Sequence, residues 1–409
     1  MIADLHIHSK YSRACSSKLT IPNLEKWARI KGIELLGTGD FTHPEWFKHL
    51  KKHLIEEDGI LKTESGFKFL LQTEISLMYT QDNKGRKIHQ VVLAPSFDVV
   101  EQISDALLKR GRLDYDGRPI FKIPSPEFVE LLRDISKDIE VIPAHCMTPH
   151  FGLFGASNQF NSVEECFKDQ TKHIHALETG LSADPEMLFR IPQIDNYLFI
   201  SSSDSHSFWP WRIGREATIF NIKPAYKKLL KAIRTKEGFN STIEFWPQEG
   251  KYHYTGHRKC NICLHPKEAM KINNICPKCN QQLTIGVAQR VEELASRPEG
   301  FKPKNAQPTI HLIPLAELIA NAKGHAVNTK SVWGEYNNLI RYFSNEFEIL
   351  LKSKKEDLLK ITSPKIVDLI LKNREEKLRV LPGYDGVYGK LILADSEMEN
   401  KQKGLNDFF

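Results

Sequence analysis

The sequence predicts an α/β protein in which a barrel-like first half is followed by a cysteine-rich module and a helical C-terminal part. β-rich runs alternate with helical stretches over residues 1–220, a pattern typical of parallel strands with helices packed outside them. Four cysteines then occur as two close pairs between residues 260 and 279. Beyond residue 305 the apolar residues recur mainly with helical spacing.

The composition is that of a soluble protein with more than one domain. The chain has 409 residues, of which 41% are hydrophobic and 26% are charged, so about two or three domains can form. No apolar run is long enough to span a bilayer, and no signal peptide precedes the first strand, which predicts a cytoplasmic protein with no membrane partner. The net charge of +6 is compatible with a polyanionic partner but does not require one.

The first half contains β-rich runs that are separated by helical segments. Helical stretches such as IPNLEKWARIK precede several of the runs. Seven such strands fit a barrel-like α/β fold better than one short open sheet. The seven runs are, in order, MIADLHI, GIELLGTGD, KFLLQTEIS, IHQVVLAP, DIEVIPAHC, HIHALETG and YLFISSSDSH.

Polar side chains that can bind metals lie at or just beyond the C-terminal ends of these runs. Active sites of α/β barrels form at that end of the strands, so we expect these side chains to meet there. His89 is the exception, because it stands at the start of its run. The side chains at the strand ends are His6, His8, Asp40, Glu74, His145, Glu178, Asp204 and His206.

The first run places its ligands on one face. Residues i and i+2 of a strand share a face, so His6 and His8 point the same way, with Asp4 before them. Imidazoles together with carboxylates suit Zn, Mn or Fe. The group exceeds the needs of one ion, which indicates about two or three ions sharing carboxylates, as in phosphate ester cleavage. The alternative for Glu178 is that it contacts a metal ligand and not the metal itself.

These motifs resemble those of the PHP (polymerase and histidinol phosphatase) domain. The resemblance implies a distorted seven-stranded (β/α) barrel that holds up to three metals. The matches are His6 and His8 for the opening H-x-H, Glu74 for the central glutamate, His89 for the histidine after it, His145 for the later histidine, and Asp204 and His206 for the closing D-x-H.

Two departures from the PHP pattern concern the third metal. In GTGDFTHP the chain keeps Asp40 of the T-D-H motif but has Phe41 in place of its histidine, with His43 further on. A histidine that often follows H-x-H is also missing from SKYSRACSS. The barrel ligands implied are therefore His6, His8, Asp40, Glu74, His89, His145, Asp204 and His206, with Asp4, His43 and Glu178 as further candidates.

The cysteine-rich module has the spacing of a zinc ribbon. Of the seven cysteines, four form C-x2-C, a twelve-residue gap and a second C-x2-C. Four thiolates close a tetrahedral site, so we expect a structural Zn2+ without an open position. A redox role for one pair is the alternative, which the presence of two pairs disfavours. The predicted ligands are Cys260, Cys263, Cys276 and Cys279.

Aromatic residues and arginines follow the last ligand motif in SHSFWPWRIGR. Aromatics beside arginines can stack an unpaired base and hold its phosphates. The alternative is that the aromatic side chains fill the rim of the barrel. The candidate DNA-binding residues are Phe208, Trp209, Trp211, Arg212 and Arg215.

The chain ends in a polar tail that closes with two phenylalanines. Exposed phenylalanines on a charged tail are a liability unless a partner covers them. The pattern resembles the PIP motif that binds the sliding clamp PCNA, which implies an archaeal or eukaryotic clamp as partner. The motif residues are Gln402, Leu405, Phe408 and Phe409.

The full arrangement of barrel, cysteine ribbon, helical part and terminal clamp motif resembles the endonuclease Q family over nearly the whole chain. The implied domains are a catalytic barrel at 1–241, a zinc module at 242–300, a helical DNA-binding domain at 301–395 and a tail at 396–409. The resemblance implies catalytic roles for Asp204, Glu74 and His145, with Zn2+, Mg2+ or Mn2+ in the barrel. It also implies a cytoplasmic, nucleoid-associated and archaeal setting.

The family is known for DNA repair endonucleases that nick 5′ to deaminated bases (hypoxanthine, uracil and xanthine) and at abasic sites. Two other functions stay open from the residues alone. One is a PHP phosphatase of small phosphate monoesters, for which neither the ribbon nor the clamp motif is needed. The other is a non-catalytic, clamp-associated DNA-binding module, which the nearly complete ligand set disfavours.

Overall fold

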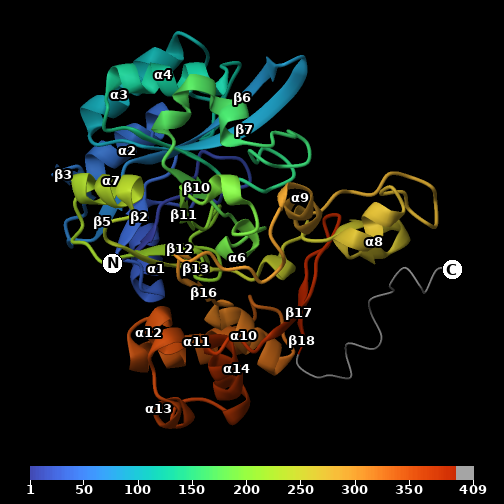
Figure 1. Cartoon of the computed structure of the whole chain (residues 1–409). Coiled ribbons are helices and arrows are strands. Elements are labelled where there is room, and N and C mark those ends of the chain that lie inside the picture. Colours follow the sequence, from blue (N-terminus) through green and yellow to red (C-terminus); the bar gives the residue numbers. More distant parts are fainter. Residues whose placement is uncertain (393–409) are drawn as a thin grey trace.

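The structure is a computed structural model that describes residues 1–392. The predicted clamp motif lies outside the described residues. The barrel-like half, the cysteine module and the helical C-terminal part are three adjoining regions, with the cysteine module projecting to one side (Figure 1). This arrangement confirms the predicted fold class. None of the described helices has the length and apolar character of a membrane span.

The strands that carry the N-terminal motifs lie in the middle of a mixed sheet. β1 (Ile2–Asp4) pairs in parallel with β2 (Leu35–Gly37), and β2 pairs in parallel with β5 (Lys68–Leu70). On its other side β1 pairs antiparallel with β12 (Ala217–Phe220). The complete order of this eight-stranded sheet is β16-β13-β12-β1-β2-β5-β4-β3, in which β3 is Ile55–Glu57 and β4 is Ile60–Lys62.

A second sheet contains a long hairpin, which corrects the expectation of uniformly parallel strands. β6 (Gln72–Gln81) and β7 (Lys84–Leu93) pair antiparallel. The residues between them, Asp82 and Asn83, have φ angles of 52° and 58°, as tight hairpin turns require. β8 (Ile120–Phe121) and β9 (Glu140–Pro143) flank the hairpin, and β10 (Ala176–Glu178) pairs in parallel with β11 (Leu198–Ile200).

Helices cover the outside of these sheets (Figure 1). Neighbouring strand residues fall into different apolar clusters, as the alternation of a strand requires. Leu35 and Ile200 belong to one cluster together with residues of α7, whereas Leu36 and Phe199 belong to the larger cluster beneath the other helices. The main covering helices are α1 (Ile21–Lys31), α2 (Pro44–His53), α3 (Phe97–Leu108), α4 (Ser125–Ile135) and α7 (Tyr226–Thr235).

The eight-stranded sheet takes its last strand from beyond the cysteine module. β13 (Phe239–Glu244) pairs antiparallel with β12 and in parallel with β16 (Thr309–His311). The boundary expected at residue 241 therefore falls inside β13, and the one at residue 300 lies before β16. Residues 245–308 form a crossover between two adjacent strands. The module contains β14 (Thr255–His257), β15 (Ile262–Leu264), α8 (Pro266–Lys271) and α9 (Val287–Leu294).

The helical part ends in a hairpin that returns to the cysteine module. Two residues between the strands of this hairpin contact the module. The Tyr384 hydroxyl donates to Asn261 Oδ1 at 2.7 Å, and Asp385 Oδ2 accepts from the Arg258 backbone N–H at 2.6 Å. The elements of this part are α10 (Leu315–Lys323), α11 (Lys330–Phe343), α12 (Glu346–Leu351), α13 (Lys355–Leu359), α14 (Pro364–Arg374), β17 (Arg379–Leu381) and β18 (Lys390–Ile392).

A buried ion pair joins the barrel to the helical part. Lys31 Nζ at the end of α1 lies 2.6 Å from Glu346 Oε1 at the start of α12, and both side chains are buried. Glu346 also accepts from the Leu315 backbone N–H at 3.0 Å and the Tyr336 hydroxyl at 2.8 Å. Because separating a buried pair leaves a desolvated charge, these contacts hold the two parts in one arrangement.

Candidate metal centres

Four side chains from three distant parts of the sequence converge in the barrel. His6, His8, Glu74 and Asp204 each bring one ligand atom within 4.8 Å of the other three. His8 Nε2 lies 3.1 Å from Asp204 Oδ1 and 3.3 Å from Glu74 Oε2. His6 Nε2 lies 3.6 Å from the same Asp204 oxygen. Both imidazoles therefore aim the same nitrogen at a common point between two carboxylates.

The other nitrogen of each imidazole is held from behind. His6 Nδ1 lies 3.0 Å from both carboxylate oxygens of Glu178. His8 Nδ1 lies 3.0 Å from Asp40 Oδ1 and 3.1 Å from Ser12 Oγ. A histidine that binds a metal through one nitrogen usually donates the other N–H to a carboxylate, which fixes the ring. Glu178 and Asp40 have this orienting geometry.

A second group shares Glu74 with the first. Glu74, His89 and His145 form a cluster whose ligand atoms also lie within 4.8 Å of one another. Glu74 Oε1 lies 2.8 Å from His89 Nδ1 and 3.2 Å from His145 Nε2. The other Glu74 oxygen faces His8. One carboxylate thus stands between two candidate ion positions, which is the arrangement of a bridging ligand.

Three residues of the site adopt backbone angles that L-residues rarely use. The φ angles are 45° for Asp40, 33° for His145 and 46° for Asp204. Each follows the end of a strand, where the chain must turn sharply to direct a side chain into the site. Such left-handed residues are strained and persist where the surroundings hold them, often at functional sites.

The electrostatics of the first group suit a bound cation. Burial alone would lower the pKa of His6, but the carboxylates of Glu178, Asp204 and Glu74 raise it well above its usual value. Burial opposes ionisation of Glu74, yet His89, Arg118 and His6 hold its pKa well below the usual range. The site thus collects negative charge around buried imidazoles, and His6 Nε2 has no hydrogen-bond partner. This donor set fits borderline divalent metals.

The remaining predicted ligands lie outside the two groups. Asp40 stands behind His8 rather than beside its Nε2. The His206 ring lies against that of His8 at a tilt of 47°, with ring centroids 4.4 Å apart, while its Nδ1 lies 3.0 Å from the Asp204 carbonyl oxygen. His43 stacks on Tyr11 at the start of α2, 4.1 Å between centroids.

Asp4 has a structural position. Its carboxylate accepts hydrogen bonds from the Ser203 backbone N–H at 3.0 Å and from the Gly214 backbone N–H at 2.9 Å. Burial raises its pKa to about 6. Asp4 therefore ties the first strand to the chain around the closing D-x-H motif and does not join the grouped ligands.

The sequence did not reveal Arg118, whose Nη1 donates to Glu74 Oε2 at 2.9 Å. It lies in the segment DYDGRPI, which carries no motif and no strand periodicity before the short β8. Nothing in the local pattern separates it from neighbouring surface arginines such as Arg112.

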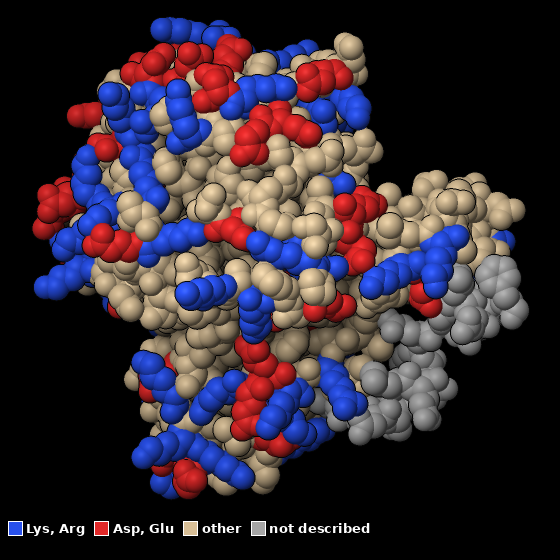
Figure 2. Space-filling view, in the orientation of Figure 1, with Lys and Arg blue, Asp and Glu red and all other residues tan. Residues whose placement is uncertain are grey.

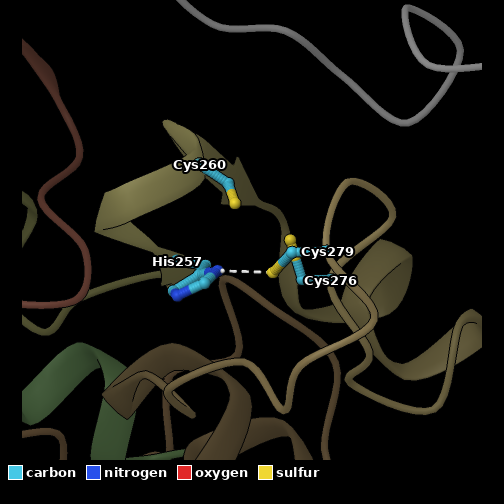
Figure 3. Close-up of side chains that lie close together, drawn as sticks. All are labelled: His257, Cys260, Cys276 and Cys279. Carbon is cyan, nitrogen blue, oxygen red and sulfur yellow. Dashed lines mark hydrogen bonds between the residues drawn. The ribbon is translucent and has the colours of Figure 1, made fainter.

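A histidine lies with three of the four predicted ligands of the cysteine module. His257, Cys260, Cys276 and Cys279 form a group, and His257 Nδ1 lies 3.3 Å from Cys279 Sγ (Figure 3). Cys263 lies on β15, where it pairs with Gly256 of β14, and it stays a predicted ligand. The signal was present in the sequence, since His257 and Cys260 have the same x2 spacing as a C-x2-C pair.

We expect His257→Ala to lower the zinc content of this module, because His257 lies with three of the cysteines that are predicted to bind the ion. Zinc per chain, measured by mass spectrometry on the purified variant, tests this. Retention of the full zinc content by His257→Ala would leave the four cysteines as the ligand set.

The aromatic segment after Asp204 is mostly packed. Trp211 and Phe208 are buried, whereas Trp209 is 37% exposed. Trp209 and Trp211 stack at 5.2 Å and contact Trp333 of α11, so the segment joins the barrel rim to the helical part. Arg215 is buried and paired with Glu317 at 3.1 Å.

Of the five candidate DNA-binding residues, the exposed ones are therefore Trp209 and Arg212. On the face shown in Figure 2, Lys and Arg side chains are interspersed with Asp and Glu over the barrel and the helical part.

Sequence comparison finds relatives in archaea and bacteria. A family described as the MJ0043 C-terminal domain matches residues 314–377. The Methanocaldococcus jannaschii protein MJ0043 is 34% identical over 261 residues, which cover 62% of this chain and 32% of that protein, so the match spans about a third of its length. The Bacillus subtilis protein YqxK is 29% identical over 411 residues, covering 95% of this chain and 98% of YqxK.

Two solved structures match the whole architecture. One is the lesion-specific endonuclease PfuEndoQ from Pyrococcus furiosus, with a TM-score of 0.86 and 31% identity over 98% of this chain and 97% of that chain. The other is endonuclease Q in complex with a 27-mer duplex that has an abasic lesion at the active site, also at 0.86 and 31%, covering 98% of this chain and 99% of that chain. The agreement extends over barrel, cysteine module and helical part together, and the chain belongs to the endonuclease Q family.

Proposed function

We propose that the protein is a metal-dependent DNA repair endonuclease that hydrolyses the phosphodiester 5′ to deaminated bases and at abasic sites. The observation that carries the proposal is the pair of ligand groups joined by Glu74, set in a chain that resembles endonuclease Q over its full length. The finer specificity for hypoxanthine, uracil or xanthine rests on the family resemblance.

The residues of the barrel have distinct tasks in this reaction. Bound divalent ions would supply a nucleophile at neutral pH and neutralise charge on the phosphate. His6, His8, Glu74 and Asp204 would hold one ion, and Glu74, His89 and His145 another. Glu178 and Asp40 hold the rings of His6 and His8 in their orientation.

The Asp204 side chain is 26% exposed, whereas that of Glu74 is fully buried. The substrate phosphate therefore approaches from the Asp204 side, with Glu74 at the base of the site.

An altered base has to leave the helix before its Watson–Crick edge can be read. The loop after His145 contains donors that could read a carbonyl, but Asn158 is already engaged. Its amide donates to the Lys87 and Gly152 carbonyls at 2.6 Å, and its Oδ1 accepts from the Lys87 N–H at 2.8 Å. Asn158 therefore fixes this loop over the β6–β7 hairpin rather than contacting the base.

A test of the function uses duplexes that contain one deoxyinosine, one deoxyuridine or one abasic site, with an undamaged duplex as control. Each is incubated with the purified protein and Mg2+, Mn2+ or Zn2+, and both new ends are mapped. A nick immediately 5′ of the lesion, absent from the control, supports the proposal. Phosphate release from small monoesters without any nicking would instead favour the phosphatase.

Asp204→Asn should reduce nicking by more than about 10²-fold while lesion DNA still binds. The substitution removes the charged oxygen that lies nearest His8 Nε2, and changing even the groups behind metal ligands costs about 10- to 100-fold. Single-turnover nicking and a filter-binding assay on the abasic duplex measure the two properties. Full cleavage by the variant would contradict the role of Asp204.

The clamp partner belongs to the same proposal and rests on the sequence Q-x-x-L-x-x-F-F alone. We propose that the tail binds PCNA and that the protein acts at DNA in the cell. Replacing Phe408 and Phe409 by alanine should abolish co-elution with PCNA while leaving nicking of free duplex unchanged. Equal co-elution of both forms would remove the clamp from the proposal.

A further inference from the structure

An arginine side chain, that of Arg118, reaches the candidate metal site from a loop that matches no known motif. The Arg118 guanidinium contacts the carboxylate shared by the two ligand groups, with Nη1 donating to Glu74 Oε2 at 2.9 Å. Its side chain is 27% exposed, whereas Glu74 is fully buried. Arg118 therefore reaches from solvent to the base of the site.

The loop is fastened on both sides of Arg118. The Arg118 backbone N–H donates to Asp116 Oδ1 at 3.1 Å, and the Gly117 N–H donates to the Tyr11 carbonyl at 3.1 Å. The Pro119 carbonyl accepts from the Ser76 N–H of β6 at 3.0 Å.

Gly117 also lies directly against the site, because a Cβ at this position would approach within 2.2 Å of Asp40 Oδ2. The absence of a side chain at residue 117 lets the loop close over Asp40. These contacts fix the guanidinium between the chain that carries His8 and the strand that carries Glu74.

Most of the guanidinium remains available. It has about five N–H donors in a planar fork, and the bond to Glu74 uses one of them. The Arg118 side chain is 27% exposed, and that of Asp204 in the same site is 26% exposed. A planar fork with free donors matches the oxygens of a phosphate.

We propose that Arg118 is a further catalytic residue, whose guanidinium binds a non-bridging oxygen of the scissile phosphodiester while it keeps its contact with Glu74. This inference rests on the proposed endonuclease function. Attack on a phosphodiester adds negative charge to the phosphate oxygens, and a fixed cation at that position stabilises this charge without reorganisation. The other role open to Arg118 is to neutralise Glu74 alone.

The test compares Arg118→Gln, Arg118→Lys and the matched control Arg112→Gln. Arg112 belongs to the same loop, but its side chain is 73% exposed and paired with Asp114. Each variant is assayed for single-turnover nicking of the abasic duplex, for the salt dependence of DNA binding, for barrel metal content and for thermal unfolding.

Arg118→Gln should nick about 10²- to 10³-fold more slowly with its metal content unchanged. Its slope of log affinity against log salt should fall by about 1, since one phosphate contact is lost. Arg118→Lys should recover part of the rate, and Arg112→Gln should behave as the parent.

Loss of barrel metal from Arg118→Gln, or an unchanged rate and salt slope, would overturn the inference, because Arg118 would then act on Glu74 alone or not at all. Failure of the parent protein to nick any lesion duplex would instead refute the proposed function. The two failures are thus distinguishable in one set of measurements.

Discussion

Glu74→Gln is expected to stop nicking and to lower the metal content of the barrel at both positions. Glu74 Oε1 faces His89 and His145, and Oε2 faces His8, so the substitution removes a charged oxygen from each ligand group. The expected loss of single-turnover rate is more than about 10²-fold. Mass spectrometry of the purified protein gives metal per chain, and the ion expected in the cysteine module should be unchanged.

Glu101→Gln is the matched control for this change, because Glu101 is a half-exposed carboxylate on α3 paired with Lys51 on the surface. It should keep the metal content and rate of the parent. If Glu74→Gln also kept both, the two groups would not share a bridging carboxylate, and two ions in the barrel could not be attributed to this geometry.

The second large effect concerns stability, and it comes from two buried carboxylates that are not members of the metal groups. Ala217 pairs with Ile243 across β12 and β13, so the same antiparallel register places Glu216 beside Glu244. Both side chains are fully buried. Glu244 Oε2 accepts from the Ser201 hydroxyl at 3.0 Å, whereas its Oε1 and both oxygens of Glu216 have no hydrogen-bond partner.

Burial raises the pKa of Glu244 to about 8, and burial together with Glu244 raises the pKa of Glu216 well above its usual value. Between pH 4.5 and pH 8 the folded state therefore keeps protons that the unfolded state has released. This contribution to the free energy of unfolding is fully present below pH 4.5. It decreases by about 1.4 kcal/mol per pH unit as the pH rises, so a few kcal/mol are lost by pH 8.

Glu244→Gln should remove the part of this pH dependence that comes from Glu244 and make the protein more stable than the parent at pH 8, while buried Glu216 still contributes its own part. Guanidinium unfolding between pH 5 and pH 8.5 gives the free energies of both. Glu64→Gln, which changes an exposed carboxylate, is the control and should follow the parent. Parallel curves for the parent and Glu244→Gln would show that Glu244 is not protonated in the folded protein.

The sequence predicted the barrel side chains well because their positions follow from strand geometry. His6 and His8 share a face, and the chain beyond the ends of β9 and β11 brings His145 and Asp204 to Glu74, near the start of β6. His89 was an exception in the sequence because it starts its run. The hairpin explains it, since the antiparallel pairing of β6 and β7 sets His89 opposite Ser76, close to Glu74.

Other features depend on distances that a linear pattern does not contain. Whether Asp40 binds an ion or holds His8 is decided by which nitrogen it approaches. Arg118 reaches Glu74 only because its loop closes over Asp40. That His257 lies with Cys260, Cys276 and Cys279 is also a matter of distance in space, although the x2 spacing before Cys260 allows it.

The position of β16 has a consequence for how the chain is made. β13 ends at residue 244, but β16, which pairs with its free edge, ends only at residue 311, after the whole cysteine module. During synthesis the edge of β13 therefore stays unpaired until residues 245–308 have been made. Unpaired sheet edges promote aggregation. Anything that slows the folding of residues 245–308, such as a lack of metal for the cysteine module, would lengthen the time for which this edge is open to other chains.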